Sequence, residues 1–288
     1  TSSVVRLFSE GGQPLAHTHL YPGDPGLFGP GSVSWKVMGD VSSFVGGVRA
    51  LLLQALHPEV AAGVADHSEY ETDPLGRLNR TSLFVTTANY GSMPEVHSAV
   101  QVVRTAHKPV LGTSERGIRY AANQPQLGAW VHNTLTDSFL EAYQTFCQVL
   151  HPDEADQFVQ EQSKIGGLLG VTELPSTAGD LRTWITEHPD LGESDALKQA
   201  WDFLRNPPLQ RGQLLGYKVV RAAAVATLPP NLAHLAGTSP RKGALFGGNR
   251  LISSLRWAMK HSPAWKASLD RCGTSYDATK FRSFEDRS

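Results

Sequence analysis

The chain contains 288 residues, of which 40% are hydrophobic, so it can bury a sizeable core within one large domain. Its formal net charge of −1 provides no overall excess of positive charge that would favour binding to nucleic acid. Two cysteines, Cys147 and Cys272, are too few for a disulfide framework or a cysteine zinc site, and we expect both to be reduced. No apolar run reaches the roughly 20 residues of a transmembrane segment. The first residues lack the apolar core of a signal peptide, so a cytoplasmic protein is expected.

The first third of the chain begins irregularly and then becomes helical. Glycine and proline crowd residues 1–34, which predicts an irregular lead-in. The first clear helix lies within residues 35–56, and Pro58 stops it and opens the next one. His57 and His67 flank that second helix, where we interpret them as core-packing or capping residues.

A basic pair follows in the stretch DPLGRLNRT. Arg77 and Arg80 are three residues apart, so one helical turn places both on the same side. Such a pair is either a solvated basic face, which spacing alone favours, or a clamp for anionic groups such as heme propionates. The next stretch, residues 82–87 (SLFVTT), is ambiguous between strand and helix.

The next predicted helix ends in a pair of polar side chains. Its apolar stripe recurs in steps of four, three and four, at Val96, Val100, Val103 and His107. Arg104 neighbours His107 on the same helix, and a cation beside a buried imidazole is costly unless it meets an anion or solvent. The pair therefore indicates a polar pocket at the end of an apolar helix.

A second histidine heads the stripe of the following helix, which Pro125 opens. This stripe consists of His132, Thr136, Phe139, Tyr143, Phe146 and Leu150. Two imidazoles that face one apolar interior from two helices could hold an iron porphyrin. A single histidine on such a stripe is more often a hydrogen-bonded core residue, so both interpretations stand at this point.

The remainder reads as further helix, with candidates at residues 178–187, 193–205, 211–227, 230–236 and 246–260. We therefore predict an all-α fold in which residues 35–262 form a single large helical domain, and a soft boundary near residues 170–180 stays open. Residues 263–288 are predicted to be a polar tail that packs loosely or wraps the surface. The motifs of serine hydrolases, zinc peptidases and dinucleotide-binding folds do not occur.

Several stretches together resemble one family of bacterial and fungal proteins, the MpaB-type oxygenases and latex-clearing rubber oxygenases. The clearest similarities are GPGSVSWKVMGD, RALLLQALHPEVAAGVADHS, DPLGRLNRT, RTAHKPVLG and YAANQPQLGAWVHNTLTDSFL. The resemblance covers most of residues 29–237. It implies a helical protein that binds heme b.

The resemblance also implies roles for individual residues. In such proteins the histidine of the Trp-Val-His segment, here His132, is the proximal iron ligand, and Arg104 lies on the distal side as a catalytic residue. Where latex-clearing members have a lysine that can ligate iron, this chain has His107, which would either ligate the iron at rest or act as a catalytic acid or base. That difference disfavours rubber as the substrate.

Other residues are assigned to cofactor binding. Arg77, Arg80 and Thr81 belong to a family signature that we assign to the pocket or to propionate contact. Trp130 and Phe139, on the segment that carries His132, are assigned to the porphyrin.

The expected function is a heme b-dependent oxygenase that uses O2 on an apolar prenyl or lipid-like small molecule and cleaves or oxygenates a C=C bond. The alternatives are a heme peroxidase or peroxygenase that uses peroxide, and a non-catalytic heme or gas sensor or carrier.

Overall fold

The computed structural model describes residues 15–67, 74–259 and 262–274, and nearly all regular structure in them is helical, as predicted. The elements in chain order are η1 (Thr18–Leu20), α2 (Val33–Met38), α3 (Ser43–Gln54), α4 (Pro58–His67), α5 (Pro74–Tyr90), α6 (Met93–His107), β1 (Leu111–Thr113), β2 (Arg119–Ala121), α7 (Pro125–Phe146), α8 (Pro152–Leu169), α9 (Ala178–Thr186), α10 (Asp195–Arg205), α11 (Arg211–Ala226), α12 (Pro230–Leu235), α13 (Ala244–Met259) and α14 (Pro263–Arg271). Within these described ranges, no helix combines the length and apolar character needed to cross a bilayer.

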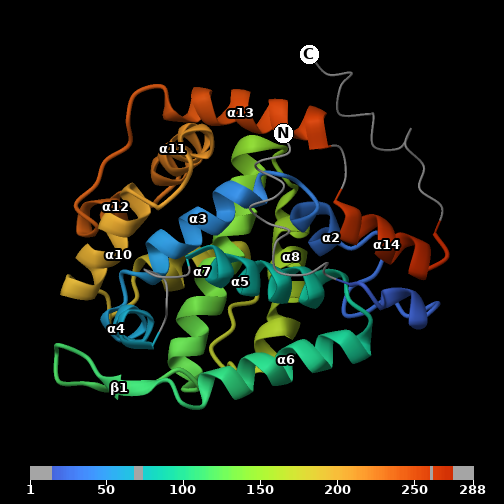
Figure 1. Ribbon diagram of the computed structural model, residues 1–288, viewed down its shortest axis with the longest axis horizontal. Helices are drawn as coiled ribbons and strands as arrows, with labels where there is room; N and C mark the ends of the chain where they lie inside the picture. Colours follow the sequence, from blue (N-terminus) through green and yellow to red (C-terminus); the bar gives the residue numbers. More distant parts are fainter. Residues whose placement is uncertain (1–14, 68–73, 260–261, 275–288) are drawn as a thin grey trace.

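Helix α7 runs through the middle of the molecule, and the other helices pack around it (Figure 1). Pro125 occupies its first turn, where proline needs no hydrogen-bond partner and its ring favours helical geometry. The helix buries residues on every side, because α3, α8, α9 and α13 all contact it. A helix covered all round is a rigid platform for any functional group that it carries.

A buried network of charged side chains joins α7 to three other parts of the chain. Arg49 of α3 is fully buried, and its Nη1 donates to Asp137 Oδ2 at 2.7 Å and to Ser138 Oγ at 2.8 Å. Its Nε donates to the backbone carbonyl of Thr227, just after α11, at 3.2 Å. The Nε of Arg182 on α9 donates to the other oxygen of Asp137 at 2.9 Å. These contacts fix the position of α7 relative to α3, α9 and the end of α11.

Two local features were not settled by the sequence. The segment 82–87, which was ambiguous between strand and helix, lies inside α5. The connection between α6 and α7 contains a small antiparallel hairpin, in which Leu111 pairs with Ala121 and Thr113 with Arg119. Gly117, with a φ of 76°, turns this hairpin, a backbone conformation that glycine adopts readily.

Loose packing, one of the two arrangements predicted for residues 263–288, is wrong for α14. Trp265 and Leu269 of this helix are buried in a second, smaller core with Trp35 and Tyr90. Two large apolar side chains four residues apart provide a face that has to be covered. The remainder of that segment, residues 275–288, lies outside the described residues, and the limits of the predicted domain stay a prediction.

We predict that Asp137→Asn lowers the free energy of unfolding by about 3–5 kcal/mol, because it leaves the guanidinium of Arg49 buried without a counter-charge. Urea unfolding at pH 7, followed by far-UV circular dichroism, measures this change. The matched control is Asp202→Asn, which breaks an exposed ion pair with Arg205 and should cost less than about 1 kcal/mol. Equal losses in the two variants would contradict the central role of the buried pair.

Candidate functional site

His132 lies two turns into α7 and is almost completely buried, with 8% of its surface exposed. Burial lowers its pKa to about 4, because the apolar surroundings disfavour the charged imidazolium. The ring is therefore neutral at pH 7, and the neutral imidazole is the form that binds a metal ion.

Among the described residues, Nε2 of the His132 ring makes only a long contact with a polar side chain. Thr136 Oγ1 lies 3.5 Å from this nitrogen and donates its hydrogen bond to the His132 carbonyl oxygen at 3.0 Å. On α8, Gly166 faces the same ring edge so closely that a Cβ there would lie only 3.1 Å from Nε2. The glycine lets α8 pack directly against the ring, and Leu174 lies at the same place, 2.8 Å from where that Cβ would be.

Arg104 and His107 are exposed on α6, where we had expected the end of a buried stripe. Val96 and Val100 are buried, Val103 is partly covered, and the stripe reaches solvent before His107. The expectation that the whole stripe is buried is therefore wrong for its second half. Desolvation by the neighbouring protein nevertheless lowers the pKa of His107.

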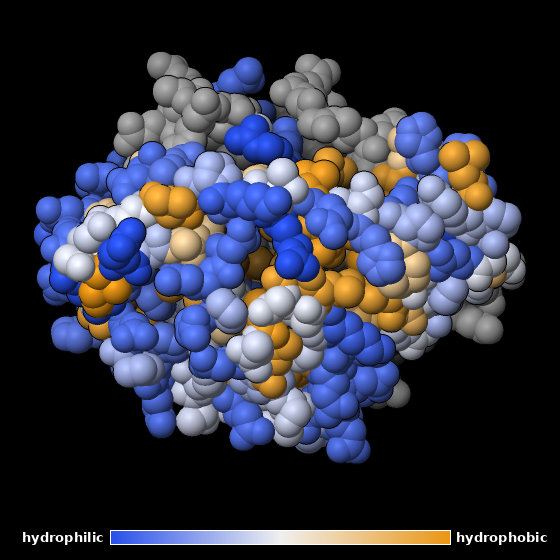
Figure 2. Space-filling model, turned by 90° about the horizontal axis from the view of Figure 1, so that it is seen from below, coloured by the Kyte–Doolittle hydropathy of each residue, from blue (hydrophilic) through white to orange (hydrophobic). Residues whose placement is uncertain are grey.

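The end of α6 lies beside the beginning of α7. The Asn123 amide, just before α7, donates to the Arg104 carbonyl oxygen at 3.4 Å. Seen from below, the molecule is hollowed near the middle of this face, and hydrophobic side chains gather beside the hollow (Figure 2). On α6 itself Val102 is exposed to 66%. The lower side of the molecule thus combines apolar surface with the polar pair of α6.

The signature residues of α5 are only partly described. The side chain of Arg77 lies outside the described residues, whereas Arg80 and Thr81 are exposed on the helix surface. Helix α5 packs along α6, which places this signature next to the element that carries Arg104 and His107. Propionate contact remains a prediction for all three residues.

Trp130 and Phe139 occupy core positions. The Trp130 ring is fully buried, its Nε1 donates to the Gln54 carbonyl oxygen at 3.3 Å, and its centroid lies 5.9 Å from that of Trp184. Phe139 packs so tightly against α3 that a Cβ on Gly46 would lie 2.8 Å from its ring. These contacts give both aromatic rings a structural role, and porphyrin contact remains a prediction.

A histidine–carboxylate cluster was not recognised in the sequence. His57, His188 and Asp190 each offer a ligand atom, and these atoms lie within 4.8 Å of one another. More than a hundred residues separate His57 from the other two, so periodicity could not bring them together. The only sequence signal is His-Pro-Asp, which occurs at residues 151–153 and again at residues 188–190.

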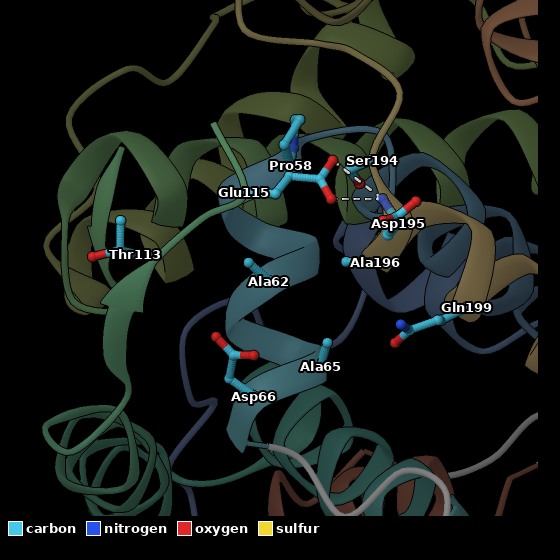
Figure 3. A pocket seen from close by; sticks show the side chains of 10 residues that line it. All are labelled: Pro58, Ala62, Ala65, Asp66, Thr113, Glu115, Ser194, Asp195, Ala196 and Gln199. Carbon is cyan, nitrogen blue, oxygen red and sulfur yellow. Dashed lines mark hydrogen bonds between the residues drawn. The ribbon is translucent and has the colours of Figure 1, made fainter. Parts of the chain in front are cut away.

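A pocket of about 260 Å³ lies elsewhere, between α4, the β1–β2 hairpin and the beginning of α10 (Figure 3). Both carboxylate oxygens of Glu115 accept from the backbone N–H of Asp195, at 3.1 and 2.9 Å. Asp66 and Asp195 add two further carboxylates to the lining, which includes none of the predicted site residues. This acidic surface is a poor match for an anionic or fully apolar ligand.

Comparison with known proteins identifies the chain over most of its length. A family model described as ER-bound oxygenase mpaB/B'/Rubber oxygenase, catalytic domain, matches residues 35–258. This is the family that the sequence motifs had indicated. A search of curated proteins found no match, and neither did a search of solved structures.

Two adjacent glycines of α8 test the position of the His132 ring. Gly166→Ala should lower the free energy of unfolding by about 1–3 kcal/mol, because the added methyl group would lie 2.8 Å from Leu174 Cδ2 and 3.1 Å from the imidazole and overpack against both. Gly167→Ala meets no atom within 4 Å and should raise stability by up to about 1 kcal/mol through helix propensity. Urea unfolding of both variants measures the difference. A gain in stability for Gly166→Ala would place the ring elsewhere.

Proposed function

Because the chain belongs to the family of mpaB and rubber oxygenase catalytic domains, we propose that it is a heme b-dependent oxygenase acting on an apolar small molecule. In this proposal His132 holds the iron from the proximal side, and Arg104 and His107 act on the opposite side. The substrate is a prenyl or lipid-like compound, and the reaction oxygenates or cleaves a C=C bond.

The state of His132 is the observation that carries the proposal. The ring is neutral, buried and free of any strong hydrogen bond at Nε2. A purely structural buried histidine would be expected to satisfy that nitrogen, because buried polar atoms without partners are costly. A bound iron would use the lone pair on Nε2. Helix α7, which carries the ring, would hold it in place.

The chain contributes binding, orientation and proton transfer. Bound heme b would supply an iron that binds and activates O2. The lowered pKa of His107 leaves its imidazole neutral at pH 7, ready to accept a proton at a ring nitrogen. The Arg104 guanidinium can orient an oxygen-bearing group beside that ring. The hydrophobic side chains around the hollow of Figure 2 favour an apolar substrate over a charged one.

The exposed position of Arg104 and His107 on α6 fits a role in acting on the substrate, while His132 holds the iron. An iron ligand has to be held rigidly, which α7 does, whereas a substrate needs a way in. Arg104 and His107 lie on the solvent side of their helix, so a substrate can reach them without unfolding the core.

We predict that His132→Ala abolishes most heme binding while helicity persists, because the mutation removes the Fe–N bond and leaves the packing of α7 nearly intact. The measurement is the heme-to-protein ratio after reconstitution of the full chain with hemin, together with far-UV circular dichroism.

His57→Ala is the matched control, because His57 is another buried histidine of similarly lowered pKa and the proposal gives it no part in heme binding. It should keep the wild-type heme ratio. Folded His132→Ala that still binds heme stoichiometrically would overturn the ligand assignment. Turnover that requires peroxide and ignores O2 would reassign the enzyme as a peroxygenase.

A further inference from the structure

His57, His188 and Asp190 form a cluster that includes neither His132 nor the Arg104–His107 pair. His57 follows α3, and the other two residues lie on the segment between α9 and α10. The backbone N–H of Gly192 donates to the Leu56 carbonyl oxygen at 3.1 Å, which ties the two segments together beside the cluster. We propose that these three side chains bind a divalent first-row transition-metal cation.

His57 supplies an imidazole that lacks a hydrogen bond. It is 3% exposed, and its buried Nδ1 makes no hydrogen bond, although Glu59 Oε2 lies 3.4 Å away. The Glu59 carboxylate is held in turn by Arg116 and by Ser114 Oγ, which donates to it at 2.7 Å. A carboxylate placed beside one ring nitrogen of a histidine orients that ring so that its other nitrogen can ligate a metal.

His188 is held by aromatic rings. Its centroid lies 4.9 Å from that of Trp130 and 4.6 Å from that of Trp184, so the imidazole is clamped beside His57. The backbone N–H of Asp190 donates to His188 Nδ1 at a long 3.3 Å, a bond that ligation through either nitrogen would give up. The Asp190 side chain is exposed and can therefore turn toward a cation.

The His-Pro-Asp turn occurs a second time, at residues 151–153, where the described residues supply no third metal ligand. In residues 151–153 the backbone N–H of Asp153 donates to His151 Nδ1 at 3.4 Å, and both side chains are exposed. The His-Pro-Asp turn by itself is thus a local backbone feature. Among the described residues, the copy at residues 188–190 is the one that lies beside a buried histidine, and this difference makes it a ligand set.

Two imidazoles and one carboxylate suit zinc or iron and leave further coordination positions for water or a substrate. Ligand atoms around tetrahedral zinc are about 3.4 Å apart, so the present spread of up to 4.8 Å has to contract by roughly 1 Å. Rotation of the exposed Asp190 side chain provides that movement.

Isothermal titration of the chelator-treated, heme-free full chain with Zn²⁺ tests this site. We expect one site per chain in the wild type, with affinity reduced on the order of tenfold or more in His188→Gln and in Asp190→Asn. His151→Gln and Asp153→Asn, in the matching exposed turn, should bind like the wild type. Absence of zinc binding, or equal effects in the two turns, would overturn the proposal, and neither result bears on heme binding.

A separate observation concerns the distribution of charge. Residues 203–269 contain ten lysines and arginines and no aspartate or glutamate, whereas the rest of the chain carries all 27 acidic residues and only 16 basic ones. A chain of nearly zero net charge therefore has one strongly basic segment, which includes α11 and α13.

The basic segment also exposes large apolar side chains. On α13, Phe246 is 69% and Trp257 80% exposed, and the exposed Arg250 lies between them with its guanidinium 5.9 Å from the centre of the Phe246 ring. On the neighbouring α11, Leu215 is 71% exposed and Lys218 follows three residues later. These two helices pack against each other at the top of the molecule (Figure 1).

The positive charges of this layer repel one another. Burial lowers the pKa of Arg221 on α11, and the nearby Arg241 and Arg205 lower it further, while its buried Nε has no hydrogen-bond partner among the described residues. Arg256 of α13 forms an ion pair with Asp40, and Arg205 forms one with Asp202, whereas Arg250 lies against the Phe246 ring. Exposed aromatic rings interleaved with basic side chains are typical of surfaces that lie in the headgroup region of an anionic bilayer. We infer that the α11–α13 surface docks on anionic phospholipid membranes.

Flotation of the full chain with vesicles tests this docking. We expect binding to vesicles that contain phosphatidylserine and little binding to pure phosphatidylcholine, because attraction depends on lipid charge. The double variant Arg241→Gln/Lys242→Gln should bind about tenfold or more weakly, and Phe246→Ser/Trp257→Ser should also bind weakly. Val102→Ser, at an exposed apolar residue of α6, is the control and should bind like the wild type.

The inference would be overturned if the wild-type protein did not float with vesicles that contain phosphatidylserine. Binding that both double variants retain in full would also overturn it.

Discussion

The buried ion pair between Arg49 and Asp137 is the interaction on which the arrangement of the core depends. A carboxylate in the middle of α7 and a guanidinium in the middle of α3 each require the other, because an unpaired charge in the interior is strongly destabilising. The pair therefore fixes how α7 is rotated about its own axis. His132 lies five residues before Asp137, about 140° around the helix, and so faces α8 when Asp137 faces α3 and α9. The ion pair between Arg49 and Asp137 thus sets the orientation of His132, the proposed iron ligand, although His132 takes no part in that pair.

Much of the helical architecture was predictable from sequence periodicity. The predicted helix at 178–187 corresponds to α9, and those at 211–227 and 230–236 correspond to α11 and α12 within a residue or two at each end. What periodicity cannot supply is the partner that covers a face. It indicated that α6 has an apolar stripe, yet it could not show that the stripe reaches solvent before His107. It likewise gave no sign that Arg49 would meet Asp137, 88 residues later, or that His57 would meet His188.

The predictions for individual site residues also differ in the support that the structure gives them. His132 was predicted from its place on a stripe and from the family resemblance, and the structure gives it the burial and neutral state that the proposed role requires. Trp130 was assigned to the porphyrin from sequence proximity alone, and its observed neighbours are Trp184 and His188. Residues adjacent in sequence on a helix face different directions, so proximity along α7 is weak support for a shared site.

The central claim is that the chain binds heme through His132 of its central helix. The most direct measurement is the visible absorption spectrum of the purified full chain reconstituted with one equivalent of hemin, recorded oxidised and then reduced. The proposed ligation predicts a Soret band and a reduced spectrum typical of histidine-ligated heme b, at one heme per chain. A spectrum identical to that of free hemin in buffer, from protein that is folded by circular dichroism, would contradict the claim.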